Sequence, residues 1–310
     1  MTKQVKNLKH LQSEIDSALS LINNKGKSLD NIGVPKSGLI AGTQSLLERC
    51  ENVVNKKKSE KPVLRVIHHL ACSGGTIFSK CIAAMPNVFL LSEAHPNTPL
   101  VDAMVPVYSP TDIPSLAKFA QIPNVKELNE KIFIKNVELA TEHVSKLGAK
   151  LVIRYHSHSD FCSSLKIPEE DRLTCLMRQN YSIAKVLTIR DPLDAYSSLV
   201  KNGWVHFTPQ TFDEYCRRYL LQLTQFEKHE IFRYEDFVSS PLLTLEEICK
   251  VLKVSCDDSF EYTFSEQKLT GDSGRKSNII GKRMRQVDEQ LKIEAERSKF
   301  YAQIRNQGWY

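Results

Sequence analysis

The sequence lacks the patterns by which membrane proteins, disulfide-rich proteins and zinc-binding proteins are recognised. Its apolar runs all fall short of the roughly 18 residues that a membrane-spanning helix needs, so we predict no membrane span. The eight cysteines are scattered and none lies in a C-x-x-C pair, which favours reduced thiols over a disulfide framework or a zinc site. The N-terminal stretch is charged and has no continuous apolar region, so we expect no signal peptide and a cytoplasmic protein.

The sequence also has little excess charge of either sign. It contains 42 basic and 36 acidic residues, and the net charge of +6 suits the binding of a small polyanion better than that of nucleic acid. With 41% hydrophobic and 25% charged residues the chain is typical of globular proteins, which excludes collagen-like, coiled-coil and wholly disordered structures. We therefore predict no nucleic-acid partner.

The first 60 residues differ from the rest of the chain. Apolar residues recur there at helical spacing between Leu8 and Ile22, and a charged run over residues 55–62 has the composition of a linker. We predict a helical N-terminal extension over residues 1–60 and a separate, larger domain over residues 61–310.

From residue 63 onward, short apolar runs alternate with helical patterns. Continuous β-branched runs are typical of strands that are covered on both faces, and their alternation with helices predicts a doubly wound α/β fold with a parallel sheet. In such folds the ligand binds at the carboxyl ends of the strands. The predicted strands cover residues 63–67, 88–91, 151–153, 186–189 and 231–234, and the predicted helices cover residues 76–85, 193–200, 211–226 and 245–252.

The first predicted strand leads into a glycine-containing loop, Cys72-Ser73-Gly74-Gly75-Thr76, that precedes a helix. This order is typical of phosphate-binding sites, because glycines let backbone amides approach the anion and the helix N-terminus adds positive potential. The alternative is a plain strand-to-helix turn in which the glycines only relieve crowding. The nucleoside-triphosphate motif G-x-x-x-x-G-K-[ST] is absent, so the anion need not be ATP with magnesium.

Five segments, taken in order, resemble the motifs of sulfotransferases that use 3′-phosphoadenosine-5′-phosphosulfate (PAPS). The resemblance covers roughly residues 63–280 and implies a P-loop-like three-layer fold with a parallel sheet of about five strands. It also implies transfer of a sulfuryl group to a hydroxyl of a carbohydrate or small-molecule acceptor, without a metal. The segments are Cys72-Ser73-Gly74-Gly75-Thr76, Arg154-Tyr155-His156, Arg190 with the following residues to Ser198, Arg233-Tyr234-Glu235-Asp236-Phe237, and Gly271-Asp272-Ser273-Gly274-Arg275-Lys276.

The resemblance implies two anion sites for the donor. The loop of residues 72–76 would hold the 5′-phosphosulfate, and a second group of residues would hold the 3′-phosphate. For Arg190 the alternative is an ion pair with Asp191 or Asp194, and for the basic C-terminal loop the alternative is a solvated surface. The residues implied in donor binding are Cys72, Ser73, Gly74, Gly75, Thr76, Arg190, Ser198, Arg275 and Lys276.

Transfer to a hydroxyl calls for a general base, and the resemblance gives that role to His156. Arg154 would then face the sulfuryl group. Glu93 and His158 remain alternative bases, since some members of the family use a carboxylate. His68 and His69 end the first strand, and we expect at least one of them to be a buried core histidine, with a role beside the loop as the alternative.

One residue departs from the family pattern. The family loop usually carries Lys or Arg where this chain has Cys72. Arg154 or Lys80 could compensate for the missing charge, and if neither does, we expect slow turnover or a different donor. A nucleophilic role for the Cys72 thiol is the less favoured interpretation.

Two other functions stay open at this point. One is a nucleotide or small-molecule kinase on a P-loop fold, and the other is a non-catalytic binding protein that retains the sulfotransferase fold. We expect residues 96–146 to face the acceptor, which would be a small molecule or a glycan, and the sequence leaves a homodimer open.

Overall fold

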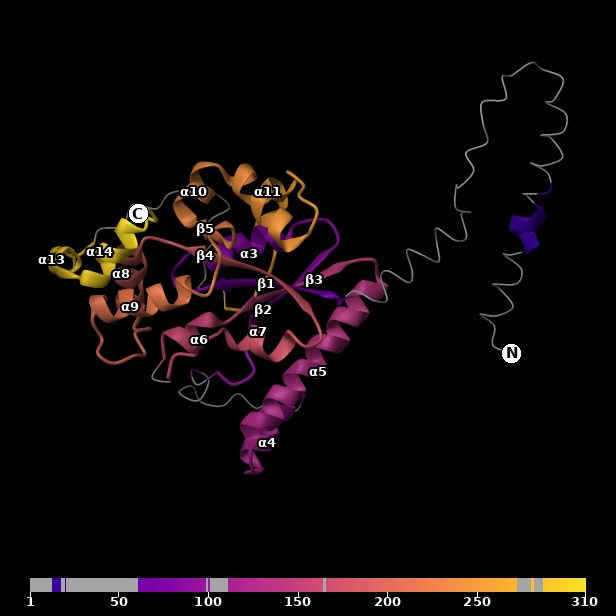
Figure 1. The fold of residues 1–310 in the computed structure, drawn as a ribbon, viewed down its shortest axis with the longest axis horizontal. Helices are drawn as coiled ribbons and strands as arrows, with labels where there is room; N and C mark the ends of the chain where they lie inside the picture. The colour runs from indigo at the N-terminus through magenta and orange to yellow at the C-terminus, as the bar shows by residue number, and fades with distance from the viewer. Residues whose placement is uncertain are drawn as a thin grey trace, which may run out of the picture. The chain divides into compact units, whose positions relative to one another are not determined.

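The structure is a computed structural model (Figure 1) that describes residues 13–17, 20, 61–98, 100, 111–163, 166–271, 280–281 and 287–310. Its internal contacts divide the chain into two units, Met1–Glu60 and Lys61–Tyr310. Residues 13–17 of the first unit are helical. The extension over residues 1–60 stays a prediction, and Arg275 and Lys276 lie outside the described residues.

The second unit is built on one parallel sheet of five strands in the order β2-β3-β1-β4-β5. This sheet confirms the predicted α/β fold class. The fourth strand begins earlier than predicted, and the fifth stops before Tyr234, where a helix begins. The strands are β1 (Val63–His69), β2 (Val88–Ala94), β3 (Lys150–Tyr155), β4 (Ser182–Ile189) and β5 (Ile231–Arg233).

Helices cover both faces of the sheet, as Figure 1 shows. On one face α3, α10 and α11 bury Ile67 and Val186 of the central strands. On the other face α5 and α7 bury Leu64, Val66 and Ile153. These strands are apolar on both sides because both sides are covered. The helices are α3 (Gly75–Ala83), α10 (Tyr234–Ser239), α11 (Pro241–Leu252), α5 (Val125–Lys146) and α7 (Arg172–Met177).

A helical layer packs beside β4 through an aromatic core. Thr211 caps α9 by accepting a hydrogen bond from the Glu214 amide, and the stripe of Phe212, Tyr215 and Tyr219 behind it is buried as predicted. The helix ends at Leu223, so it is shorter than the predicted 211–226. The layer contains α8 (Pro192–Asn202), α9 (Phe212–Leu223), α13 (Glu289–Arg297) and α14 (Lys299–Asn306), and the remaining elements are α4 (Ile113–Phe119), α6 (Ser157–Phe161), α12 (Phe260–Thr263), η1 (Lys228–Glu230) and η2 (Phe264–Glu266).

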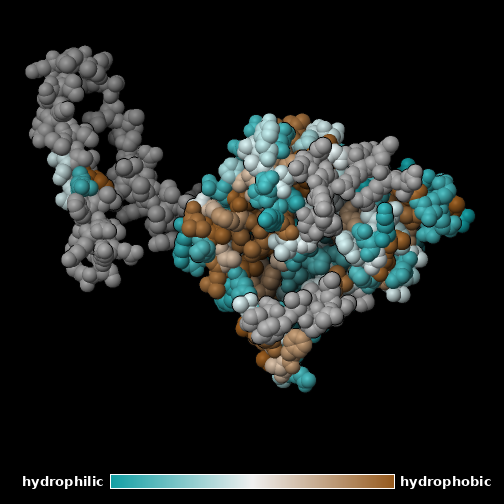
Figure 2. Space-filling model, turned by 180° about the vertical axis from the view of Figure 1, so that it is seen from behind, coloured by the Kyte–Doolittle hydropathy of each residue, from teal (hydrophilic) through white to brown (hydrophobic). Residues whose placement is uncertain are grey.

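The second unit also exposes hydrophobic side chains. Figure 2 shows them gathered in one area of the back face. Among the large exposed side chains are Phe89 and Leu91 on β2, which is an edge strand of the sheet. None of the helices in the described ranges is both long and apolar enough to span a membrane.

The buried Arg218 side chain holds the end of α6, the short helix that follows His156. Its Nη1 donates hydrogen bonds to the carbonyls of Phe161 (3.1 Å) and Ser163 (2.9 Å), at the end of α6. Its Nε pairs with Glu214 at 2.7 Å. Because α6 starts directly after β3, this contact between α9 and α6 sets the position of residues 156–159.

We expect Arg218→Met to lower the free energy of unfolding by about 3 kcal/mol, because two buried carbonyls lose their donor. The matched control is Arg217→Met, which removes a half-exposed arginine that pairs with the same Glu214 and should lower the free energy by less than about 1 kcal/mol. Urea unfolding of both variants measures the difference. Equal losses would show that the buried contacts of Arg218 do not hold α6.

Candidate functional site

The candidate site lies where the carboxyl ends of four parallel strands meet. The end of β1 leads into the glycine loop, and β2 ends next to Glu93. Arg154 lies near the end of β3, His156 follows that strand, and Arg190 follows β4. This is the edge of a parallel sheet at which α/β proteins bind their ligands.

Close packing accounts for both glycines of the loop. Gly74 has a left-handed backbone (φ 88°), and a Cβ atom there would lie 2.4 Å from the Tyr234 ring. A Cβ on Gly75 would lie 2.4 Å from the His69 ring. The first turn of α3 has no acidic residue and Gly74 provides no side-chain cap, so its amides can face an anion.

The polar side chains of the loop have different partners. Ser73 is buried and its Oγ donates to the Leu70 carbonyl at 2.7 Å, so its predicted bond to a ligand stays a prediction. Thr76 Oγ1 instead accepts a hydrogen bond from Arg154 Nη2 at 3.1 Å. Cys72 also has a left-handed backbone (φ 65°), and its Sγ lies 3.6 Å from Asn202 Nδ2.

Arg154 is the central cation of the site, and only 3% of the residue is exposed. Its Nη2 forms an ion pair with Glu93 Oε1 at 2.7 Å. Its Nε donates to His69 Nε2 at 2.8 Å, which makes His69 a neutral acceptor whose Nδ1 donates to a backbone carbonyl. Its Nη1 donates to Ser92 Oγ at 3.0 Å. Arg154 thus connects the ends of β1 and β2 with the loop.

Glu93 is held in an unusual backbone conformation. Its φ is +60°, and the pairing of β2 with β3 shifts register between Leu91 and Ala94, as in a β-bulge. Burial opposes ionisation of this carboxyl, but the Arg154 guanidinium, 2.7 Å away, outweighs burial and lowers the pKa of Glu93. Glu93 is therefore an anion over the whole physiological range.

His156 follows β3 and faces the same carboxylate. Its Nε2 lies 3.6 Å from Glu93 Oε2, and its Nδ1 lies 3.1 Å from Ser159 Oγ. Ser159 in turn shares a 2.6 Å hydrogen bond with Thr98. Burial lowers the pKa of His156 to about 4, although Glu93 acts to raise it. The ring is neutral at pH 7, and Glu93 can stabilise the cation that forms when it takes up a proton.

The third candidate base, His158, lies farther from Glu93. Its ring centroid is 6.3 Å from that of His156 and 6.2 Å from that of His206. Burial lowers its pKa to about 3. The structure therefore groups Glu93 and His156 around Arg154 and places His158 behind them.

Arg190 and Ser198 lie together beyond the loop. Arg190 is buried, pairs with Asp194 at 2.6 Å and stacks over the Tyr234 ring at 5.1 Å. Its Nε has no hydrogen-bond partner among the described residues. Ser198 Oγ donates to the Asp194 carbonyl at 2.8 Å. The ion pair with Asp194 was the sequence-based alternative to donor contact for Arg190, and it is present.

Sequence reasoning missed several residues of the site. His69 contacts both the loop and Arg154, whereas the sequence left a role beside the loop only as the alternative and did not choose between His68 and His69. Tyr234 belongs to a recognised motif, but nothing in the motif shows that its ring touches both Gly74 and Arg190. Thr270 exchanges two hydrogen bonds with Ser92, of 2.7 and 2.9 Å, and so brings a distant segment to the end of β2.

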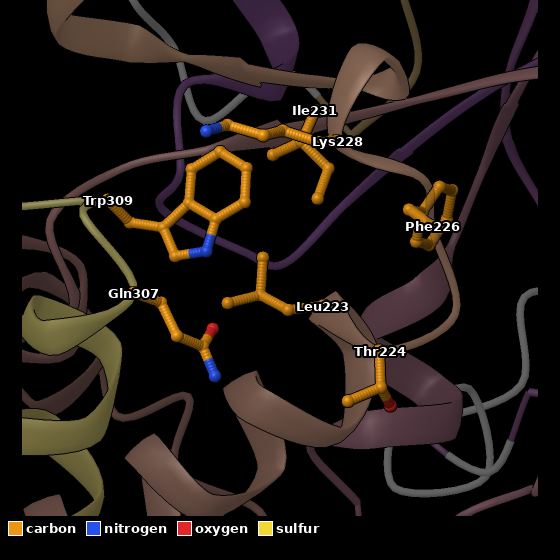
Figure 3. A pocket seen from close by; sticks show the side chains of 7 residues that line it. All are labelled: Leu223, Thr224, Phe226, Lys228, Ile231, Gln307 and Trp309. Carbon is orange, nitrogen blue, oxygen red and sulfur yellow. The ribbon is translucent and has the colours of Figure 1, made fainter.

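A cavity of about 250 Å³ lies elsewhere, between the end of α9 and the C-terminus. Figure 3 shows the Trp309 indole and the Lys228 side chain at its wall. None of the predicted site residues lines it, so it is not the site described above. The residues that line the cavity are Leu223, Thr224, Phe226, Lys228, Ile231, Gln307 and Trp309.

No group of three or more His, Cys, Asp or Glu side chains within the described ranges is arranged to hold a metal ion.

Comparison with protein-family models finds no match, and comparison with curated proteins finds none either. Solved structures do match the chain. It is similar to a sulfotransferase domain from the curacin biosynthetic pathway, with a TM-score of 0.49 and 14% identity, over 77% of this chain and 98% of that one. It is similar to a sulfotransferase domain from the Synechococcus PCC 7002 olefin synthase, with a TM-score of 0.47 and 15% identity, over 81% of this chain and 96% of that one. It is also similar to mouse sulfotransferase SULT7A1 complexed with PAP, with a TM-score of 0.42 and 13% identity, over 83% of this chain and 90% of that one.

All three are sulfotransferases. The sequence motifs resemble the same family.

The buried histidines His68 and His158 should make the stability of the folded protein depend on pH. Burial lowers the folded-state pKa of His68 to about 4 and that of His158 to about 3, below the ordinary 6.5. The unfolded chain therefore binds more protons as the pH falls below 6.5, and the folded state loses stability. We expect each of these histidines to remove about 1–2 kcal/mol between pH 7 and pH 5, as measured by urea unfolding.

His158→Gln should flatten this pH dependence, whereas His143→Gln, on the exposed surface of α5, should leave it unchanged. The same slope in the His158 variant and the wild type would contradict the neutral, buried state of His158.

Proposed function

We propose that the chain is a sulfotransferase that moves a sulfuryl group from PAPS to a hydroxyl of a carbohydrate or small-molecule acceptor. The observation that carries this proposal is the set of contacts made by Arg154. One guanidinium bonds Thr76 of the loop, Glu93 and His69, and Glu93 faces His156. A cation, a base and an amide loop at one point are what transfer of an anionic group to a hydroxyl requires.

The donor carries two anionic ends, and the chain offers two sites that fit them. The uncapped first turn of α3, with Gly74 and Gly75, suits the phosphosulfate. Arg190, whose Nε meets no hydrogen-bond acceptor within the described part of the chain, and the neighbouring Ser198 suit the 3′-phosphate. The Tyr234 ring lies against both sites. PAPS, when bound, supplies the activated sulfuryl group.

Arg154 supplies the positive charge that the loop itself lacks at Cys72. It is buried, so its electrostatic effect is screened less than that of a surface cation. Its bond to Thr76 aims the guanidinium at the start of α3. We therefore assign to Arg154 the stabilisation of charge on the transferring group. We do not assign Cys72 the role of a nucleophile.

We assign the general base to His156. Its pKa of about 4 leaves the ring neutral and able to take a proton, whereas Glu93 is held in the 2.7 Å ion pair with Arg154, which lowers the pKa of that carboxyl. Glu93 then orients the ring and stabilises the imidazolium, while the more deeply buried His158 takes no proton.

The acceptor would approach from the side of residues 96–146. Thr98, at the start of this segment, bonds Ser159, the partner of His156. The segment also contains α5, a helix that the sequence patterns did not predict.

None of the described cysteines forms a disulfide, which supports the proposed cytoplasmic setting.

We expect His156→Ala to lower kcat about 100-fold to 10,000-fold, the usual contribution of a general base, with little change in the affinity for 3′-phosphoadenosine 5′-phosphate (PAP). Arg190→Gln should weaken PAP binding and change kcat little. Transfer of labelled sulfate from PAPS to a panel of glycans and phenols gives kcat, and calorimetry gives the PAP affinity.

Other outcomes would overturn the proposal in different ways. Binding of ATP but not of PAP to the wild-type protein would favour the kinase. Binding of PAP without transfer to any acceptor would favour a non-catalytic binding protein. Full activity of the His156 variant would return the role of the base to Glu93 or His158.

A further inference from the structure

We propose that Gly271 is a positioning residue that holds the Glu93 carboxylate between Arg154 and His156, an inference that rests on the function proposed above. Gly271 has a left-handed backbone, with φ at +66°. A Cβ atom there would lie 2.3 Å from Glu93 Cγ, 2.7 Å from Cδ and 2.8 Å from Oε1. Only a residue without a side chain fits against Glu93 as it stands.

The order of these distances shows that a small movement of the Glu93 carboxylate would not make room for a Cβ atom. The nearest atom is Cγ, near the root of the Glu93 side chain, and the carboxylate oxygen is farther away. Rotating the carboxylate alone therefore does not make room. The whole side chain must take another rotamer, which breaks the 2.7 Å ion pair with Arg154 and the 3.6 Å approach to His156.

The backbone at Gly271 cannot easily move away instead. The preceding residue, Thr270, donates from Oγ1 to the Ser92 carbonyl and accepts from Ser92 Oγ. Its carbonyl also receives a 3.4 Å contact from Arg154 Nη1. The segment is thus tied to the same strand end and the same arginine that hold Glu93, so the two sides of the contact are fixed together.

We expect Gly271→Ala to lower kcat about 10-fold to 100-fold, a part of what a well-oriented base contributes. The matched control is Gly148→Ala, because Gly148 has a similar backbone (φ +74°) but a Cβ there would meet nothing within 4 Å. Both variants strain a left-handed residue, and only the first displaces Glu93. Equal activities of the two variants would overturn the proposal.

The pH profile of kcat separates positioning from general damage. Burial and the charge of Arg154 lower the pKa of His156, and the Glu93 carboxylate raises it; the other titratable groups around the ring are His69, His95 and His158. Displacing Glu93 should move the acid limb of the Gly271→Ala profile to lower pH. An unmoved limb would show that Gly271 affects activity without acting through Glu93.

A stability measurement tests the contact without any activity. In a Glu93→Ala background the new Cβ has space, so Gly271→Ala should lower the thermal midpoint no more than Gly148→Ala does, whereas with Glu93 present it should lower it further. Equal losses in both backgrounds would overturn the proposed contact. If the protein transfers no sulfuryl group to any acceptor, the proposed function fails, and this measurement still decides whether Gly271 fixes Glu93.

Discussion

The site depends on one constraint, which is that the buried Arg154 charge must be neutralised and fully hydrogen-bonded. A guanidinium that is 3% exposed is stable only where partners surround it. The sheet supplies these partners by bringing Glu93, His69 and Ser92 to the ends of neighbouring strands, and the loop adds Thr76. The sheet order β2-β3-β1 makes this convergence a direct result of the topology.

This constraint also sets the chemistry of the neighbouring groups. Arg154 keeps Glu93 ionised, and the ionised Glu93 lies beside a neutral His156. A fixed anion next to a neutral imidazole favours uptake of a proton by the ring. On the other side Arg154 is aimed at the start of α3, where the chain has no cation of its own at Cys72. A single buried charge thus serves both the proposed donor site and the proposed base.

The sequence predicts best what local patterns decide. The five strands and the glycine loop were predicted because continuous apolar runs and a glycine pair are local signals. The early part of β4 was missed because Ser182 and Lys185 interrupt the apolar run, and the end of β5 was overextended because Tyr234 is apolar enough for a strand but begins α10. Gly271 belongs to a recognised segment, but its contact with Glu93 and the bonds between Ser92 and Thr270 could not be predicted, since each joins residues 178 positions apart in the chain. Glu93 and His156 were both named, but only the structure shows that they face each other.

A double-mutant cycle on Arg154 and Glu93 tests the central claim most directly. The free energy of unfolding is measured for Arg154→Met, for Glu93→Gln and for the double variant. If the pair organises the site, each single variant loses about 3 kcal/mol because it leaves a buried partner unpaired, and the double variant loses little more than either one. Losses that simply add in the double variant would show that the two charges act independently and would contradict the account.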